Sequence, residues 1–184
     1  MLLGSTLACV PVALAQSGGS EQGFFDVRSA STSLVNDVQE LDARLQLVLS
    51  SDALSALNSG VPLTIELNLE VIRVRRFMLD ATEAELNLQY ELEYRPLSQR
   101  YIVRNLNSGD QDSFATLYSA LNNLGRVQRL PIIDNSLLDP NAEYRIRLQA
   151  LLSTSSYPAV LRLLFFWRGD WQIKSDWYEW RLEQ

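Results

Sequence analysis

The strongest constraint on the fold is a strict alternation of apolar and polar residues over residues 83–95, "EAELNLQYELEYR". Apolar side chains occupy the even positions from Ala84 to Tyr94, whereas acids or amides occupy the odd positions as far as Glu93. A period of two places the two sets on opposite faces of a β-strand, so one face is buried and the other is wet. Residues 41–49 and 143–152 repeat the pattern. Strands with one wet face are typical of antiparallel sheets, and the sequence therefore predicts a mainly β protein.

The alternation changes phase within residues 61–77, "VPLTIELNLEVIRVRRF". Apolar residues stand at odd positions as far as Val71, but Ile72 and Val74 stand at even positions. One extra residue at 71–72, forming a β-bulge, would return both side chains to the core face. In the hairpin register that this bulge implies, Arg75 faces Glu85 on the wet side of the sheet.

Two further segments have the spacing and end signals of helices, residues 50–60 and 110–125. Each begins with Ser or Asp, which can cap the first turn, and each is followed by a glycine. Residues 157–169 fit either a short helix or a buried strand, and we favour the helix because Pro158 suits a first turn. The expected fold is an antiparallel β-sandwich of about seven strands with two or three short helices, forming a single domain over residues 24–184.

The N-terminal residues 2–15, "LLGSTLACVPVALA", are uncharged, mostly apolar or small, and end in Ala-Leu-Ala. This pattern is typical of a secretory signal peptide and is too short to span a bilayer, although no basic region precedes it. We expect cleavage after Ala15, a flexible linker over residues 16–23, and a periplasmic mature protein. A lipid-modified Cys9 is the alternative interpretation of the same segment.

The composition excludes several kinds of chemistry from the mature chain. The chain has no histidine, and cleavage after Ala15 removes its single cysteine. A disulfide, a thiolate nucleophile, a Ser-His-Asp triad and a zinc or copper site on imidazole or sulfur are therefore excluded. The formal net charge of −6 disfavours nucleic acid as a partner. The acids between Glu83 and Glu93 share one polar stripe without an evident cleft, and we expect no enzyme activity, no cofactor and no metal site.

All four tryptophans lie in the last twenty residues, "FFWRGDWQIKSDWYEWRLEQ". As a strand, residues 171–182 place Trp171 and Trp177 on one face and Trp180 on the other. This is a second phase change, around residues 175–177, which fits a bulge or a strand that passes between sheets. We expect Trp171 and Trp177 to be core residues and Trp180 to cover the opposite face. The alternative is an aromatic platform for an apolar ligand.

A basic group precedes the expected hairpin turn: Arg73, Arg75 and Arg76, followed by Phe77. One interpretation is a solvated strand face whose arginines pair with glutamates of the next strand, where each exposed pair contributes little. The other is a docking surface for lipid headgroups or for an acidic partner.

Several stretches together resemble a family of proteobacterial envelope proteins catalogued as domain of unknown function 4390. The matching stretches are "ALNSGVPLTIELNLEVIRVRRF", "LQYELEYRPLSQRYIV", "FATLYSALNNLG", "YPAVLRL" and "WQIKSDWYEWRL". The resemblance implies a secreted, mostly β domain without an assigned activity, whose gene often lies near that of a membrane sensor kinase. It supplies no catalytic residue.

We therefore expect a non-catalytic periplasmic binding or assembly module that modulates a membrane sensor kinase or contacts another envelope protein. The alternative is a carrier of a lipid or other apolar ligand through the C-terminal aromatic segment. A membrane surface stays open as a partner, and so does the oligomeric state. The candidate contact residues are Arg73, Arg75, Arg76, Phe77, Trp171, Trp177 and Trp180.

Overall fold

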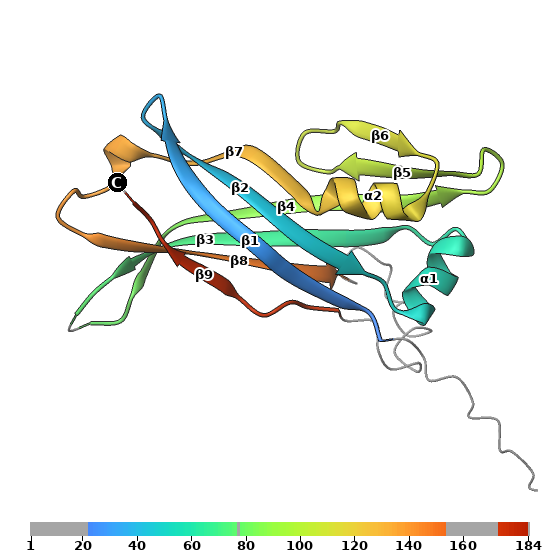
Figure 1. The fold of residues 1–184 in the computed structure, drawn as a ribbon, viewed down its shortest axis with the longest axis horizontal. Coiled ribbons are helices and arrows are strands. Elements are labelled where there is room, and N and C mark those ends of the chain that lie inside the picture. Colours follow the sequence, from blue (N-terminus) through green and yellow to red (C-terminus); the bar gives the residue numbers. More distant parts are fainter. Residues whose placement is uncertain (1–21, 77, 154–172, 184) are drawn as a thin grey trace, which may run out of the picture.

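A computed structural model describes residues 22–76, 78–153 and 173–183 (Figure 1). These residues form nine strands: β1 (Phe24–Val35), β2 (Val38–Val48), β3 (Leu63–Val74), β4 (Ala81–Arg95), β5 (Arg100–Asn105), β6 (Gln111–Phe114), β7 (Arg126–Asp134), β8 (Glu143–Ser153) and β9 (Tyr178–Arg181). They also form the α-helices α1 (Ser51–Asn58) and α2 (Leu117–Leu124), and a short 3₁₀ helix, η1 (Asn135–Leu137).

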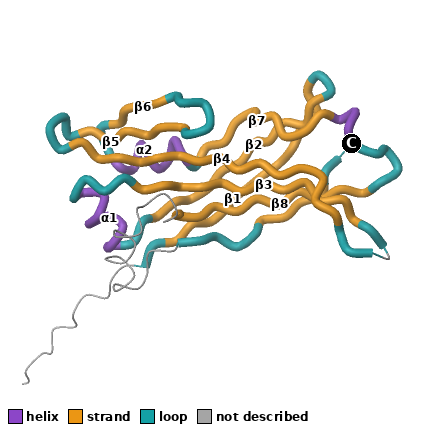
Figure 2. The backbone as a smooth tube through the Cα atoms, turned by 180° about the vertical axis from the view of Figure 1, so that it is seen from behind, coloured by secondary structure: helices purple, strands orange, loops and turns teal. Residues whose placement is uncertain are grey.

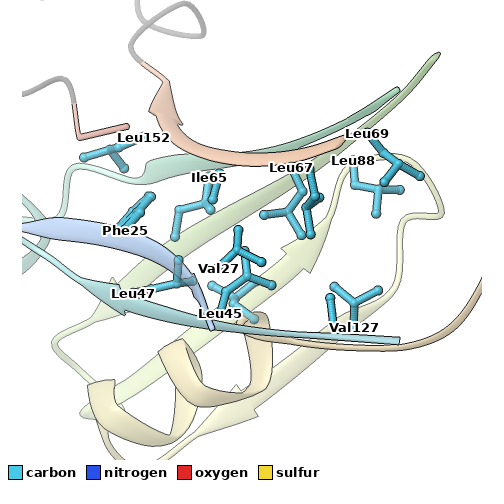
Figure 3. Close-up of a cluster of buried hydrophobic side chains, with 14 of the residues drawn as sticks. Phe25, Val27, Leu45, Leu47, Ile65, Leu67, Leu69, Leu88, Val127 and Leu152 are labelled. Carbon is cyan, nitrogen blue, oxygen red and sulfur yellow. The ribbon is translucent and has the colours of Figure 1, made fainter. Parts of the chain in front are cut away.

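The strands form two antiparallel sheets that pack face to face, as the tube view from behind also shows (Figure 2). The small sheet has the order β1-β2-β7, and the large sheet has the order β6-β5-β4-β3-β8-β9. Side chains such as Leu45 and Leu47 of the small sheet and Ile65 and Leu67 of the large sheet point toward one another in the core (Figure 3). The expected antiparallel β-sandwich is confirmed, with nine described strands in place of about seven.

The predicted faces of the regular strands are also confirmed. Leu88 and Leu92 of β4 are buried, and so are Leu41 and Leu45 of β2 and Ile146 of β8. The intervening polar residues form the outer face of each sheet. The alternation in the sequence therefore reports which side of each strand meets the other sheet.

The phase change in β3 does coincide with a register shift, but the extra residue is on the other strand. Val71 pairs with Ala84 and Ile72 pairs with Thr82, so Glu83 of β4 is the residue without a partner in β3. β3 itself pairs with β8 without a break. Ile72 therefore stays on the outer face, and the prediction that it returns to the core face is wrong.

Ile72 is nevertheless only 6% exposed, because it is covered on the outer face. Arg145 of β8 lies directly opposite Ile72, and its guanidinium reaches Asp80, the residue before β4. A long arginine side chain in this position can cover apolar surface with its aliphatic part.

The predicted contact between Arg75 and Glu85 is wrong. Glu85 faces Glu70, while Arg75 lies in the β3–β4 connection, where its backbone N–H donates to Asp80. The register differs because β3 ends at Val74 and β4 already begins at Ala81, so the connection is shorter than the sequence pattern indicated.

Helix α1 agrees with its prediction: Ser50 caps it, and its side chain accepts a hydrogen bond from the N–H of Ala53. Helix α2 begins later than predicted, with Thr116 as its cap. Residues 111–114, which were predicted to be the first turn of that helix, instead pair with β5 as the edge strand β6. The helix predicted over residues 157–169 lies outside the described residues.

Strand β7 was not predicted. It carries Pro131, and its pairing with β2 shifts register twice. Proline is tolerated there because β7 is an edge strand, whose outer side needs no hydrogen-bond partner in the sheet.

Candidate functional site

The end of the sandwich that holds the described C-terminal residues is hollowed and rich in arginine. Here the β3–β4 connection, the loop between η1 and β8, and the residues after β9 come together (Figure 1). Three adjoining open hollows of about 300, 420 and 590 Å³ all include Glu143 in their walls. The largest is lined by Arg73, Val74, Arg75, Arg76, Asn141, Ala142 and Glu143. We call this region the arginine end.

Arg73 lies in the wall of the largest hollow, where an ion pair holds its side chain. It stands opposite Tyr144 in the pairing of β3 with β8, and its guanidinium lies 2.6 Å from the Asp139 carboxylate. The buried Tyr144 hydroxyl accepts a 3.0 Å hydrogen bond from the backbone N–H of Asp139. A hydrogen bond from the backbone N–H of Asn141, together with the nearby Arg73 guanidinium, lowers the pKa of Asp139. Arg73 is thus part of the structure of this end.

Two further arginines of this end also have counter-ions. The Arg145 guanidinium lies 2.7 Å from Asp80 and 3.2 Å from Glu179. Arg181 pairs with Glu143. Their charges are therefore largely balanced within the protein.

Arg75 and Arg76 differ from these arginines. Both are exposed, and neither side chain makes an ion pair or hydrogen bond in the described part of the chain. The nearest carboxylate along the chain, Asp80, already accepts from the Arg75 backbone N–H at 3.1 Å and from Arg145. Two positive charges at the rim of the largest hollow are thus left available for a partner.

Apolar side chains follow these arginines in the same connection. Met78 is 71% exposed and Leu79 is 91% exposed. Phe77, which the sequence analysis included in the candidate surface, lies outside the described residues. The structure therefore places free guanidinium groups and exposed aliphatic side chains on one short hairpin connection.

Of the described C-terminal aromatic residues, Trp180 also lines the arginine end, in the wall of the 420 Å³ hollow. Between the pairs Leu151–Lys174 and Leu148–Tyr178, the C-terminal segment advances four residues and β8 advances three. The second predicted phase change is therefore a bulge.

The predicted orientations of Trp177 and Trp180 are wrong, because the bulge falls before Trp177. Trp180 stands opposite Ile146, packs against the core, and its Nε1 lies 3.4 Å from the Thr32 hydroxyl. Trp177 is half-buried on the outer face, where the Arg147 guanidinium lies 4.5 Å from its ring centroid. Trp171 lies outside the described residues.

A second pair of arginines without counter-ions was missed by the sequence analysis. Arg44 of β2 lies directly opposite Arg126 of β7 on the small sheet, and both are exposed. No ion pair joins either side chain to another described residue. Recognition of residues 126–134 as a strand would have revealed this pair, but Pro131 obscured it.

The side chains of the arginine end are suited to binding anionic groups. Guanidinium groups present planar arrays of N–H donors that match carboxylates and phosphates, and they stay charged at any physiological pH. Met78 and Leu79 add apolar surface beside these donors. The fold and this site together define a β-sandwich protein with a basic, apolar-tipped end.

Comparison with protein-family models identifies the family. Residues 23–181 match the model of DUF4390, a domain of unknown function, and the chain belongs to this family. Neither the curated proteins nor the solved structures contain a match. Among the residues that the structure describes, no helix is long and apolar enough to cross a bilayer.

Proposed function

We propose that this protein is a non-catalytic binding or assembly module of the periplasm, which docks on an envelope partner through its arginine end. A membrane sensor kinase is the partner that the resemblance to the family suggests. The N-terminal segment with the features of a signal peptide supports the location.

The observation that carries this proposal is the pair Arg75 and Arg76, which lack a counter-ion at the rim of the largest hollow. A protein of net charge −6 repels an acidic partner over most of its surface. Two free guanidinium groups beside an open hollow therefore favour approach by this end.

Carriage of an apolar ligand by the C-terminal aromatic residues is the less favoured alternative. One face of the Trp177 ring is occupied by the Arg147 guanidinium, and Trp180 packs against the core. Trp180 lines only the 420 Å³ hollow, whereas Arg75 and Arg76 line the largest of the three.

A site-specific crosslinking experiment tests the proposal. A photoreactive amino acid at position 79, beside Arg75 and Arg76, should capture a discrete envelope protein in living cells. The double substitution Arg75→Gln and Arg76→Gln should weaken capture roughly 30-fold, if each charge-assisted contact contributes about 1 kcal/mol.

The matched control is Arg126→Gln with Arg129→Gln, which removes the same charge from exposed positions on β7. Capture by this control should equal capture by the unmodified protein. Equal capture by the Arg75/Arg76 double variant would instead show that the arginine end is not the docking surface.

A further inference from the structure

We propose that the β3–β4 connection docks on an anionic lipid surface, with Met78 and Leu79 entering the headgroup layer and Arg75 and Arg76 binding lipid phosphates. This inference rests on the proposed function, because it names the surface that the arginine end meets first. We call the described residues of this connection, 75, 76 and 78–80, the hairpin tip.

The first observation is the position of the apolar residues. The hairpin tip projects beyond the neighbouring strands at one end of the sandwich (Figures 1 and 2). Met78 and Leu79 are consecutive, and they are 71% and 91% exposed. Apolar side chains at a projecting tip can enter a bilayer surface without any change in the packed core, and their burial there stabilises the bound state.

The second observation is the charge of the same tip. Arg75 and Arg76 have no counter-ion, whereas Asp80 is held by the Arg75 backbone N–H and by the Arg145 guanidinium. The carboxylate is thus engaged inside the protein, and the two guanidinium groups face outward. This charge pattern complements the phosphates of an anionic membrane.

The free arginines and the exposed aliphatic residues share one short connection. Arg75 and Arg76 directly follow the end of β3, Met78 comes next among the described residues, and Leu79 and Asp80 lead into β4. An anionic membrane surface offers phosphates and acyl chains in adjoining layers. A connection that carries both guanidinium groups and aliphatic side chains therefore matches both layers.

Vesicle co-sedimentation of the purified protein tests this inference. The protein should bind vesicles that contain phosphatidylglycerol and should bind vesicles of phosphatidylcholine alone much more weakly. Arg75→Gln with Arg76→Gln should lower the partition coefficient roughly 30-fold, because each arginine near an anionic leaflet contributes about a factor of five. Met78→Ser with Leu79→Ser should lower it roughly tenfold or more, since several methylene groups leave the lipid.

Two control variants remove the same kinds of side chain from other parts of the protein. Leu97→Ser removes a fully exposed leucine from the β4–β5 turn at the other end of the sandwich, and Arg126→Gln with Arg129→Gln removes two charges from β7. Both controls should bind anionic vesicles as the unmodified protein does. A urea unfolding curve for each variant shows that the fold is retained.

Absence of binding to the anionic vesicles would overturn the inference, and so would binding that the two tip variants leave unchanged. The outcome is distinct from that of the proposed function. Loss of vesicle binding together with retained, Arg75/Arg76-dependent capture of an envelope protein would identify a protein surface as the contact of this end.

Discussion

A row of four charged residues crosses the outer face of the large sheet, and it allows a sharp prediction about stability. Glu85 of β4 faces Glu70 of β3, Glu70 faces Arg147 of β8, and Arg147 faces Glu179 of β9. One cation thus stands among three carboxylates. We predict that neutralising Arg147 lowers the free energy of unfolding clearly more than neutralising its partner Glu70.

The geometry sets the magnitudes. Nε and Nη2 of Arg147 both donate to Oε2 of Glu70, at 3.0 and 2.6 Å. The two side chains are 31% and 15% exposed, so the pair lies between an exposed ion pair, at about 0.2–1 kcal/mol, and a buried pair that costs about 3–5 kcal/mol to break. Arg147→Gln also removes the contact with Trp177, which contributes about 0.5–1 kcal/mol.

Arg147→Gln should therefore lower the free energy of unfolding by about 2–3 kcal/mol, because the largely buried Glu70 loses its ion-pair partner while it still faces Glu85. Glu70→Gln should cost about 1 kcal/mol or less. Its amide oxygen still accepts from Arg147, and its repulsion with Glu85 disappears.

Urea denaturation at pH 7, followed by tryptophan fluorescence and circular dichroism, measures both values. The difference between the two variants should shrink at high salt, where the carboxylate repulsion is screened. Arg95→Gln, which disturbs an exposed pair with Glu93, is the control and should cost well under 1 kcal/mol. A Glu70→Gln cost equal to or above that of Arg147→Gln would refute the reasoning.

Three further predictions concern the core, a glycine and the acid limb of stability. Trp177→Ala should lower the free energy of unfolding by about 1–2 kcal/mol, and Leu67→Ala should lower it by roughly 2–5 kcal/mol. The difference arises because Trp177 lies on the outer face and Leu67 is buried between the sheets. Thermal unfolding that ranks the two variants in the opposite order would contradict this placement. Gly125→Ala should lower the free energy of unfolding by roughly 1–3 kcal/mol, since the added Cβ would lie 2.4 Å from the backbone oxygen of Leu45. An unchanged urea midpoint would be incompatible with so close an approach. The pKa of Asp139 in the folded protein lies below its usual value of 3.8, so the folded state binds this proton less readily than the unfolded state. Its contribution to stability is present above that value and is lost as the pH falls through the lowered pKa, and Asp139→Asn should make unfolding less steep in acid; acid titrations that superimpose for the two proteins would argue against the lowered pKa.

Much of the fold could be predicted because the relevant signals are local. The alternation within residues 83–95 depends only on which face of one strand is buried. The cap of α1 is equally local, since Ser50 and the N–H of Ala53 are three residues apart. These features needed no knowledge of strand pairing.

Register and long-range neighbours were decided by the tertiary structure. Whether Val71–Ile72 or Glu83 supplies the irregularity depends on pairing with two strands at once, since β3 must also match β8 without a break. The site depends on the same kind of information. Arg75 and Arg76 looked no different from Arg73 in the sequence, and only folding brings Asp139 to Arg73.

The sequence by itself determined the absence of histidine, the two-faced strands and the basic character of the residues before the hairpin turn. The tertiary structure decided which tryptophan meets the core, which arginines lack a counter-ion, and that the polar Gln39 is fully buried with its amide nitrogen 3.2 Å from the backbone oxygen of Glu183. The physical reason is that burial and charge compensation are properties of pairs of residues. Such pairs form only when strands distant in the chain settle into one register.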